Sequence, residues 1–137
     1  MKVFDADRTV MGRLATQVSQ ELMSGEEIII VNAEKAIITG SATNIKARYR
    51  MKRSLTHPRK GPKYPKMPDM IVKRTIRGMI PYQKPSGRAA YRRLKVYIGI
   101  PREFQKKKVT PLKYPQKDLP AKYITVGEVS KHLGSKF

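Results

Sequence analysis

Apolar residues near the start of the chain recur at the spacing of one face of a helix. The positions concerned, three or four residues apart, are Met11, Leu14, Ala15, Val18 and Leu22. This spacing predicts an amphipathic helix that buries one side. Thr9 is expected to cap its start, and Gly25 suits its end because glycine adopts positive φ without strain.

Short apolar runs around this helix predict strands. Residues 2–5 can form a first strand, and EIIIVNA (27–33) is a β-branched run typical of a strand buried on both faces. AIITG (36–40) predicts a further strand, and LKVYIG (94–99) predicts another. Strand, helix and strand at the start of the chain form the pattern of a βαβ unit, for which a right-handed crossover is expected.

A second helix, predicted over about 43–55, combines an apolar face with many cations. The predicted face contains Ala42, Ile45 and Tyr49. The cations lie on both sides of it: Lys46, Arg50 and Arg53 on one side, Arg48 and Lys52 on the other. The helix can therefore dock by one edge while its basic side chains project on both sides.

Two further helices are predicted before the strand at 94–99. The first begins near Pro68 and Asp69, which suit a first turn, and Pro81 ends it. Its expected buried residues are Val72, Ile76, Met79 and Ile80, and its outward cations are Lys73, Arg74 and Arg77. Ser86 is expected to cap the second. That short helix carries Arg88, Arg92 and Arg93.

Two proline-rich basic segments are predicted to lack helices and central strands. HPRKGPKYPKMPD (57–69) holds four prolines and four cations. Proline fixes φ, has no N–H and disfavours the helical region in the residue before it. KKKVTPLKYPQKDLP (106–120) has no periodicity and predicts an extended arm, whereas TVGEVSKHLG (125–134) predicts a short terminal helix.

The organisation expected is one domain over 1–137, with an α/β core at 1–100 that contains a basic loop at 56–68. The arm and terminal helix occupy 101–137. The chain has no cysteine, which excludes a disulfide scaffold and a thiol nucleophile. The first residues lack the pattern of a signal peptide, and the longest purely apolar run, 28–31, is too short to cross a bilayer. A soluble, cytoplasmic protein without a membrane partner is expected.

Charge is distributed unevenly along the chain. Lys and Arg number 30 against 10 Asp and Glu, a formal net charge of +20. Residues 1–40 hold 4 basic and 6 acidic side chains, whereas residues 41–117 hold 23 and 2. A surface adapted only for solubility usually mixes both signs, so this concentration of cations predicts a polyanionic partner.

The residues offer little for catalysis. His57 lies beside a proline in the basic loop and His132 lies near the C-terminus, and structural or exposed positions are expected for both. Asp5 and Asp7 are expected to bond local backbone or end a strand rather than act as an acid–base pair. Neither GxxxxGK nor GxGxxG occurs. We therefore expect no catalytic residue, metal, cofactor or small-molecule substrate. An RNA-modifying enzyme, which would need such features, is a weak alternative.

The density of cations favours nucleic acid. They recur on predicted helices, loops and the arm, at 46–53, 59–66, 73–77, 84–93 and 106–117. Among them lie Tyr64, Tyr82, Tyr91 and Tyr114, which can stack on unpaired bases or pack in the fold. Because no zinc finger, recognition helix or RNP motif is present, irregular basic loops favour folded RNA over specific DNA sites. A DNA-compacting protein is the main alternative.

The stretch IRGMIPYQKPSGRAAYRRLKVYIG (76–99) resembles the signature of the universal large-subunit ribosomal protein thirteen, or L-thirteen, family. Its Arg-Gly-Met-aliphatic-Pro turn corresponds to residues 77–81, its Gly-Arg to residues 87–88, and its Leu-Lys-Val-Tyr-x-Gly to residues 94–99. DADRTVMGRLATQVSQEL (5–22) and VNAEKAIITG (31–40) resemble two N-terminal blocks of the family. The proline-rich insert and the C-terminal tail resemble its archaeal and eukaryotic branch.

The resemblance implies an α/β fold, with three α/β/α layers around a mostly parallel four-stranded sheet, plus basic loops and an extended C-terminal arm. It also implies a non-enzymatic component of the cytoplasmic large ribosomal subunit. Such a protein would bind large-subunit rRNA, contact neighbouring ribosomal proteins and take part in early assembly. From charge and placement, the residues expected to bind RNA are Arg48, Arg50, Lys52, Arg53, Arg59, Lys60, Lys63, Lys66, Arg74, Arg77, Lys84, Arg88, Arg92 and Arg93.

Overall fold

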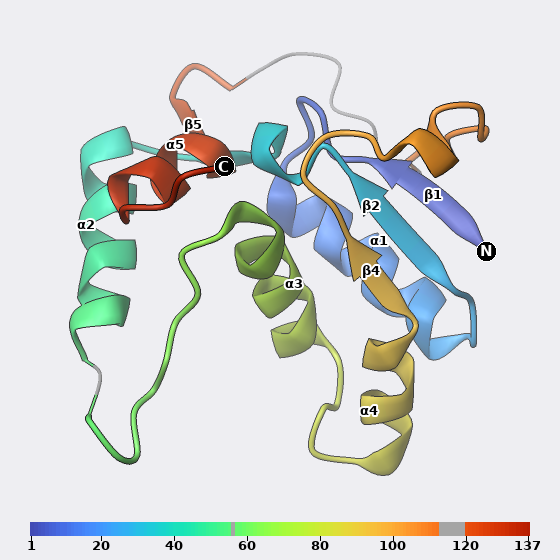
Figure 1. The fold of residues 1–137 in the computed structure, drawn as a ribbon, viewed down its shortest axis with the longest axis horizontal. Helices are drawn as coiled ribbons and strands as arrows, with labels where there is room; N and C mark the ends of the chain where they lie inside the picture. Colours follow the sequence, from blue (N-terminus) through green and yellow to red (C-terminus); the bar gives the residue numbers. More distant parts are fainter. Residues whose placement is uncertain (56, 113–119) are drawn as a thin grey trace.

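The computed structural model describes residues 1–55, 57–112 and 120–137 and shows a mixed α/β architecture (Figure 1). Its elements in chain order are β1 (Lys2–Asp5), α1 (Met11–Met23), β2 (Ile28–Val31), η1 (Ala33–Lys35), β3 (Ile37–Thr39), α2 (Ala42–Ser54), α3 (Pro68–Met79), α4 (Pro85–Arg92), β4 (Leu94–Val96), η2 (Arg102–Phe104), β5 (Tyr123–Thr125) and α5 (Val126–His132). The helices and strands expected from the apolar pattern are therefore present.

A parallel sheet of three strands, in the order β1-β2-β4, forms the centre of the fold. Val3 lies opposite Ile29, and Ile29 lies opposite Lys95, so β2 is the middle strand. β2 is buried at all four positions, as its unbroken apolar sequence predicts. The β1–α1–β2 segment confirms the expected βαβ unit, because β1 and β2 are parallel.

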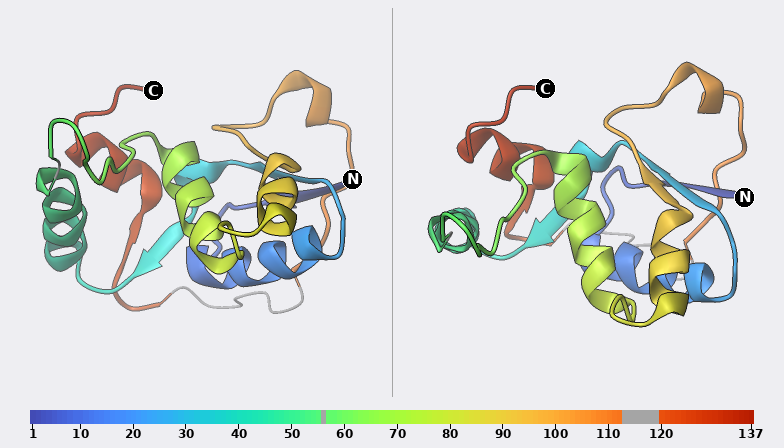
Figure 2. Two further views of the ribbon diagram at one scale, coloured as in Figure 1. Left: turned by 90° about the horizontal axis from the view of Figure 1, so that it is seen from below. Right: turned by 60° about the horizontal axis from the view of Figure 1, so that its bottom comes forward.

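The helices that cover this sheet lie on one face of it (Figure 2). Phe4, Ile28, Ile30 and Leu94 point into the main core, which α1, α3 and α4 complete. On the opposite face, Val3, Ile29 and Val31 pack against Tyr97 and Phe104 of the segment that follows β4. In the described part of the chain that second face is covered by a loop with the η2 turn, which differs from the helical third layer expected.

The strand expected at 36–40 exists but does not join the parallel sheet. It is β3, and it pairs antiparallel with β5, with Ile38 opposite Ile124. The η1 turn redirects the chain after β2, and Asn32 at its start has a positive φ of 55°. The described residues thus form a sheet of three strands and a separate ribbon of two, where one sheet of four was expected.

Helix α1 has the predicted buried face but not the predicted cap. Leu14, Val18 and Leu22 are fully buried. Val10 occupies the N-cap position without a side-chain bond to the helix. Thr9 instead donates its hydroxyl hydrogen to the carbonyl oxygen of Asp7, because it lies in the turn one residue before the cap.

Helix α3 begins at Pro68 as predicted, but one expected core residue is wrong. Val72, Ile76 and Ile80 are buried, whereas Met79 is 44% exposed. The buried face runs through positions four residues apart, and Ile71 completes it instead.

The expected cap of α4 is also wrong. The helix begins at Pro85 with Lys84 at the N-cap, so Ser86 lies inside its first turn. Proline at the first helical position needs no N–H partner, which explains the earlier start.

Residues 57–67 of the proline-rich run form no helix or strand, as predicted. Helix α5 packs against the end of this run. Ser130 donates a hydrogen bond to the carbonyl oxygen of Lys66. Thr125 caps α5 through a capping box with Glu128. Of the expected extended arm, residues 113–119 lie outside the described residues.

Candidate nucleic-acid interface

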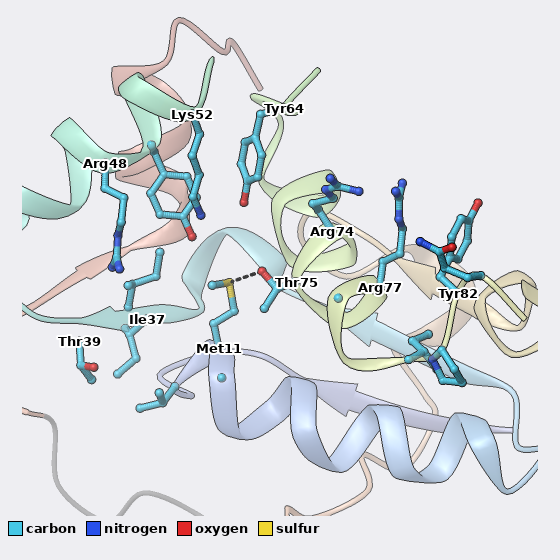
Figure 3. A pocket seen from close by; sticks show the side chains of 18 residues that line it. Met11, Ile37, Thr39, Arg48, Lys52, Tyr64, Arg74, Thr75, Arg77 and Tyr82 are labelled. Atoms are coloured by element: carbon cyan, nitrogen blue, oxygen red, sulfur yellow. Dashed lines mark hydrogen bonds between the residues drawn. The ribbon is translucent and has the colours of Figure 1, made fainter. Parts of the chain in front are cut away.

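A groove of ≈ 780 Å³ lies between α2, α3, the start of α1 and β3 (Figure 3). Arg48 and Lys52 project from α2 on one side, and Arg74 and Arg77 stand on α3 on the other. These four are among the cations expected to bind RNA. α2 and α3 are joined by the proline-rich run, so that connection places the two basic helices on opposite sides of the groove.

The floor of the groove is largely apolar. It includes Met11 and Ile37, which are 8% and 2% exposed, together with the exposed hydroxyl-bearing Thr39. The Thr75 hydroxyl lies 3.1 Å from the carbonyl oxygen of Ile71 and 3.7 Å from the Met11 sulfur, so α3 contacts α1 beneath the groove. The groove thus combines a cationic rim with an apolar base.

Two tyrosines hold the Lys52 ammonium in place. Its Nζ lies 5.0 Å from the ring centre of Tyr49 and 5.1 Å from that of Tyr64. The two rings meet edge to face with centres 5.7 Å apart. Cation–π attraction to both rings orients the ammonium. Lys52 therefore has fewer conformations to lose on binding an anion than a freely rotating surface lysine.

The cations of the groove repel one another. The pKa of Lys52 is lowered, first by partial burial and then by the positive charges of Arg48 and Arg74. Among the described residues no carboxylate lines the groove, and their ion pairs join Met1 to Glu26 and Lys2 to Glu21. An anion placed here would relieve the repulsion.

For the tyrosines among the cations, both stacking on bases and packing in the fold were open, and those in the described residues are packed in the fold. Tyr64 and Tyr91 are partly buried against the core. Tyr82 meets Tyr91 edge to face, with ring centres 5.3 Å apart, and the Arg77 guanidinium carbon lies 4.5 Å from the Tyr82 ring centre. Burial raises the pKa of Tyr49 above its ordinary value of 10.0. Tyr114 lies outside the described residues.

The remaining predicted cations do not gather at this groove. Seven of them are exposed on the loop at 57–67 and around α4: Arg59, Lys60, Lys63, Lys66, Lys84, Arg88 and Arg92. Arg50 faces the other side of α2, where a second groove of ≈ 540 Å³ also contains Lys46 and His132. The basic surface is therefore broad, and four of the predicted cations line the groove.

Two predicted cations have partners within the fold. Arg53 donates from Nη1 to the carbonyl oxygen of Tyr64 over 3.0 Å, which holds the loop against α2. Arg93 donates from Nη2 to the carbonyl oxygen of Leu22 over 2.8 Å, at the end of α1. Each therefore has a structural role that its charge did not predict.

Two further cations, Lys73 and Lys46, lie near the expected RNA-binding residues but are not among them. Lys73 lies over the ring of Tyr91, with Nζ 5.1 Å from its centre, and Lys46 lines the second groove. Their spacing was a usable signal, because each is four positions from a chosen residue, Arg77 and Arg50. Gly12 and Gly78, which line the main groove, had no such signal.

In the part of the chain that the structure describes, no helix is long and apolar enough to span a membrane. The same residues contain no group of three or more His, Cys, Asp or Glu side chains placed to hold a metal ion.

Fold and groove together define a small basic α/β protein whose cations surround an acid-free cleft. The model of the family described as Ribosomal protein L13 matches residues 1–103. Relatives align over nearly their whole length, so the chain belongs to the ribosomal protein L13 family, whose members are ribosomal proteins and not enzymes.

Three relatives illustrate the likeness, and each is named large ribosomal subunit protein uL13. Those of Methanosphaera stadtmanae and Methanosarcina barkeri are each 48% identical, with 98% and 100% of both chains covered. That of Methanocaldococcus jannaschii is 47% identical over the full length of both chains. All three organisms are archaea, in keeping with the archaeal and eukaryotic branch expected from the insert and tail.

Proposed function

We propose that the protein is a structural constituent of the large ribosomal subunit, located in the cytoplasm, that binds and braces large-subunit rRNA. It would act by position and charge, without catalysis. Membership of the L13 family and the names of the relatives support the ribosomal assignment. Contacts with neighbouring large-subunit proteins, a part in early subunit assembly and support of translation belong to the same proposal.

The observation that carries the rRNA-binding part is the acid-free groove. Arg48, Lys52 and Arg74 are close enough for the charges of the two arginines to lower the pKa of the lysine. A cluster of like charges without a carboxylate is costly in the free protein and favourable once phosphate groups neutralise it. The exposed cations of the 57–67 loop and α4 extend this surface, so several RNA segments can be held at once.

The four-stranded form of the sheet stays part of the proposal. Val109 forms a parallel bridge with Val3, and the Thr110 N–H donates to the carbonyl oxygen of Val3 over 2.7 Å. These contacts lie at the free edge of β1. We infer that the arm would complete a fourth strand there when the protein is bound.

Binding to rRNA and to duplex DNA at equal salt separates the proposal from a DNA-compacting protein. The expected result is salt-dependent binding to large-subunit rRNA that excess duplex DNA of the same phosphate concentration does not displace. Equal competition by DNA would favour the alternative. Copurification with large subunits after a high-salt wash is expected as well, and loss of the protein in the wash would count against a structural role.

A further inference from the structure

We propose that the groove between α2 and α3 receives one unpaired nucleotide extruded from the bound rRNA. This inference rests on the proposed function and adds what the groove recognises. A phosphate would lie against Arg48, Lys52 and Arg74, with its ribose and base over the floor formed by Met11 and Ile37.

Two glycines within helices border the groove. Gly12 lies in α1 and Gly78 in α3, and both line the groove. A Cβ atom built on either would meet no heavy atom within 4 Å, and neither has a positive φ. Neither glycine is therefore required by the backbone or by packing, although glycine is among the least favourable helix residues. An absent side chain at both places leaves room for something outside the chain.

The chemistry around that room suits a nucleotide better than it suits a phosphate alone. A phosphate needs cations only, whereas the groove also has an apolar base and the hydroxyl-bearing Thr39 on its floor. A volume of ≈ 780 Å³ falls within the roughly 300–1,000 Å³ typical of sites for small organic molecules. Extruded bases in folded RNA are commonly read by such pockets, because an unstacked base exposes an apolar face and polar edges together.

Filling the groove without changing its charge tests the proposal. Gly78→Leu adds bulk to the groove where a Cβ meets nothing, and it keeps every cation. Gln20→Leu, at an exposed position of α1 that does not line the groove, adds the same side chain as a matched control. We expect Gly78→Leu to weaken rRNA binding at least about fivefold, on the scale of one base contact, with an unchanged salt slope. Equal affinities for the two variants would overturn the proposal.

A second measurement uses small probes and the wild-type protein. In NMR titrations, adenosine 5′-monophosphate is expected to shift the methyl signals of Met11 and Ile37, whereas inorganic phosphate shifts only signals of the surrounding cations. Identical shift patterns for the two probes would also overturn the proposal of a nucleotide site, because they would show that the groove binds phosphate without binding a base.

Failure of this inference and failure of the proposed function give different results. If Gly78→Leu binds rRNA like the control while binding stays salt-dependent, the groove holds no nucleotide and the ribosomal role stands. If the wild-type protein shows no salt-dependent binding to large-subunit rRNA, the proposed function itself is wrong. Thermal unfolding of both variants confirms that each is folded before the affinities are compared.

Discussion

At the scale of single residues, two glycines of the family signature have opposite roles. A Cβ atom at Gly87 would lie 2.1 Å from the carbonyl oxygen of Pro81, so only glycine lets the start of α4 pack against that turn. A Cβ at Gly78 would meet nothing within 4 Å. The first glycine is explained by the fold, and the second is explained by the groove.

Gly87→Ala is therefore expected to destabilise the protein by at least roughly 1–3 kcal/mol, because backbone atoms of Pro81 and Tyr82 would have to move. Gly78→Ala, the matched control, is expected to be neutral or to stabilise by roughly 0.4–1 kcal/mol, since it restricts the unfolded chain without a clash. Urea unfolding measures both changes. Equal stability of Gly87→Ala and wild type would contradict the close packing at Pro81.

The ionisation of Lys52 makes stability depend on pH. Its pKa in the folded protein is lower than the ordinary 10.5, so the unfolded chain holds more protons between the two values. The free energy of unfolding therefore rises with pH across that interval. Tyr49, Tyr64 and Tyr91 have raised pKa values and act in the opposite direction, but only above about pH 10, where an unfolded tyrosine begins to ionise.

Lys52→Met is expected to flatten the rise in stability below pH 10 and to weaken RNA binding at neutral pH. The substitution removes a charge that the fold disfavours and that the RNA would neutralise. Denaturant unfolding at several pH values measures the first effect, with Lys60→Met in the exposed loop as control, and an RNA titration against wild type measures the second. If the pH profile of Lys52→Met were identical to that of Lys60→Met, the pKa of Lys52 would not be lowered by the fold.

The sequence predicted which residues of this site are cationic but not which of them meet. Arg48 and Lys52 were identified beside the apolar edge of their helix, and Arg74 on the outward side of the next. Their approach across one groove depends on how the 57–67 loop returns the chain, and no local pattern encodes that path. The same limit applies to Arg93, whose bond to Leu22 joins residues 71 positions apart.

At the scale of elements, the terminal helix anchors the basic loop. Ser130 in α5 is fully buried and donates to the carbonyl oxygen of Lys66, and Ser135 is close to the sulfur of Met67. The loop is thus held at the end that leads into α3. Cations on the loop can then project outward while its last residues stay in place.

Ser130→Ala is expected to destabilise the protein by roughly 1–3 kcal/mol, because the Lys66 carbonyl would lose its partner at a site that α5 covers. Hydrogen exchange in residues 57–67 is expected to increase at the same time. Ser54→Ala, at an exposed site on α2, is the control and should change stability by less than about 0.5 kcal/mol. Equal effects of the two substitutions would show that the Ser130 hydrogen bond does not hold the basic loop against α5.

Apolar periodicity predicted where helices and strands occur better than it predicted which strands pair with each other. The run at 28–31 had to be a central strand because no polar position interrupts it, and β2 is buried throughout. The run at 37–39 is equally apolar at its first two positions, yet it pairs with β5. Which edge a short strand joins depends on turns such as η1 and on a partner more than 80 residues away, which composition cannot reveal.

At the scale of the whole molecule, the residues that build the core and the residues proposed to bind RNA are largely different. The near-neutral N-terminal part supplies β1, α1, β2 and β3, whereas most cations lie on exposed surfaces of later segments. Net charge of +20 on a small chain opposes compaction, so an anionic partner should also stabilise the fold.

Joint neutralisation of Arg59, Lys60, Lys63 and Lys66 to Gln is expected to weaken rRNA binding while leaving the thermal unfolding temperature nearly unchanged. All four side chains are exposed and form no ion pair within the described residues. Filter binding and calorimetry measure the two quantities. Unchanged rRNA affinity across a salt titration would remove the loop from the binding surface.

The central claim is that the groove cations neutralise RNA phosphates. Its most direct test is the salt dependence of rRNA affinity for wild type and for a variant with Arg48, Lys52, Arg74 and Arg77 changed to Gln. Each phosphate contact contributes a slope of roughly 0.7–0.9 in log affinity against log salt. Because Arg48, Lys52 and Arg74 would share one phosphate, we expect the variant's slope to be smaller by about 1 or more. Parallel salt titrations for the two proteins, with equal slopes, would contradict it.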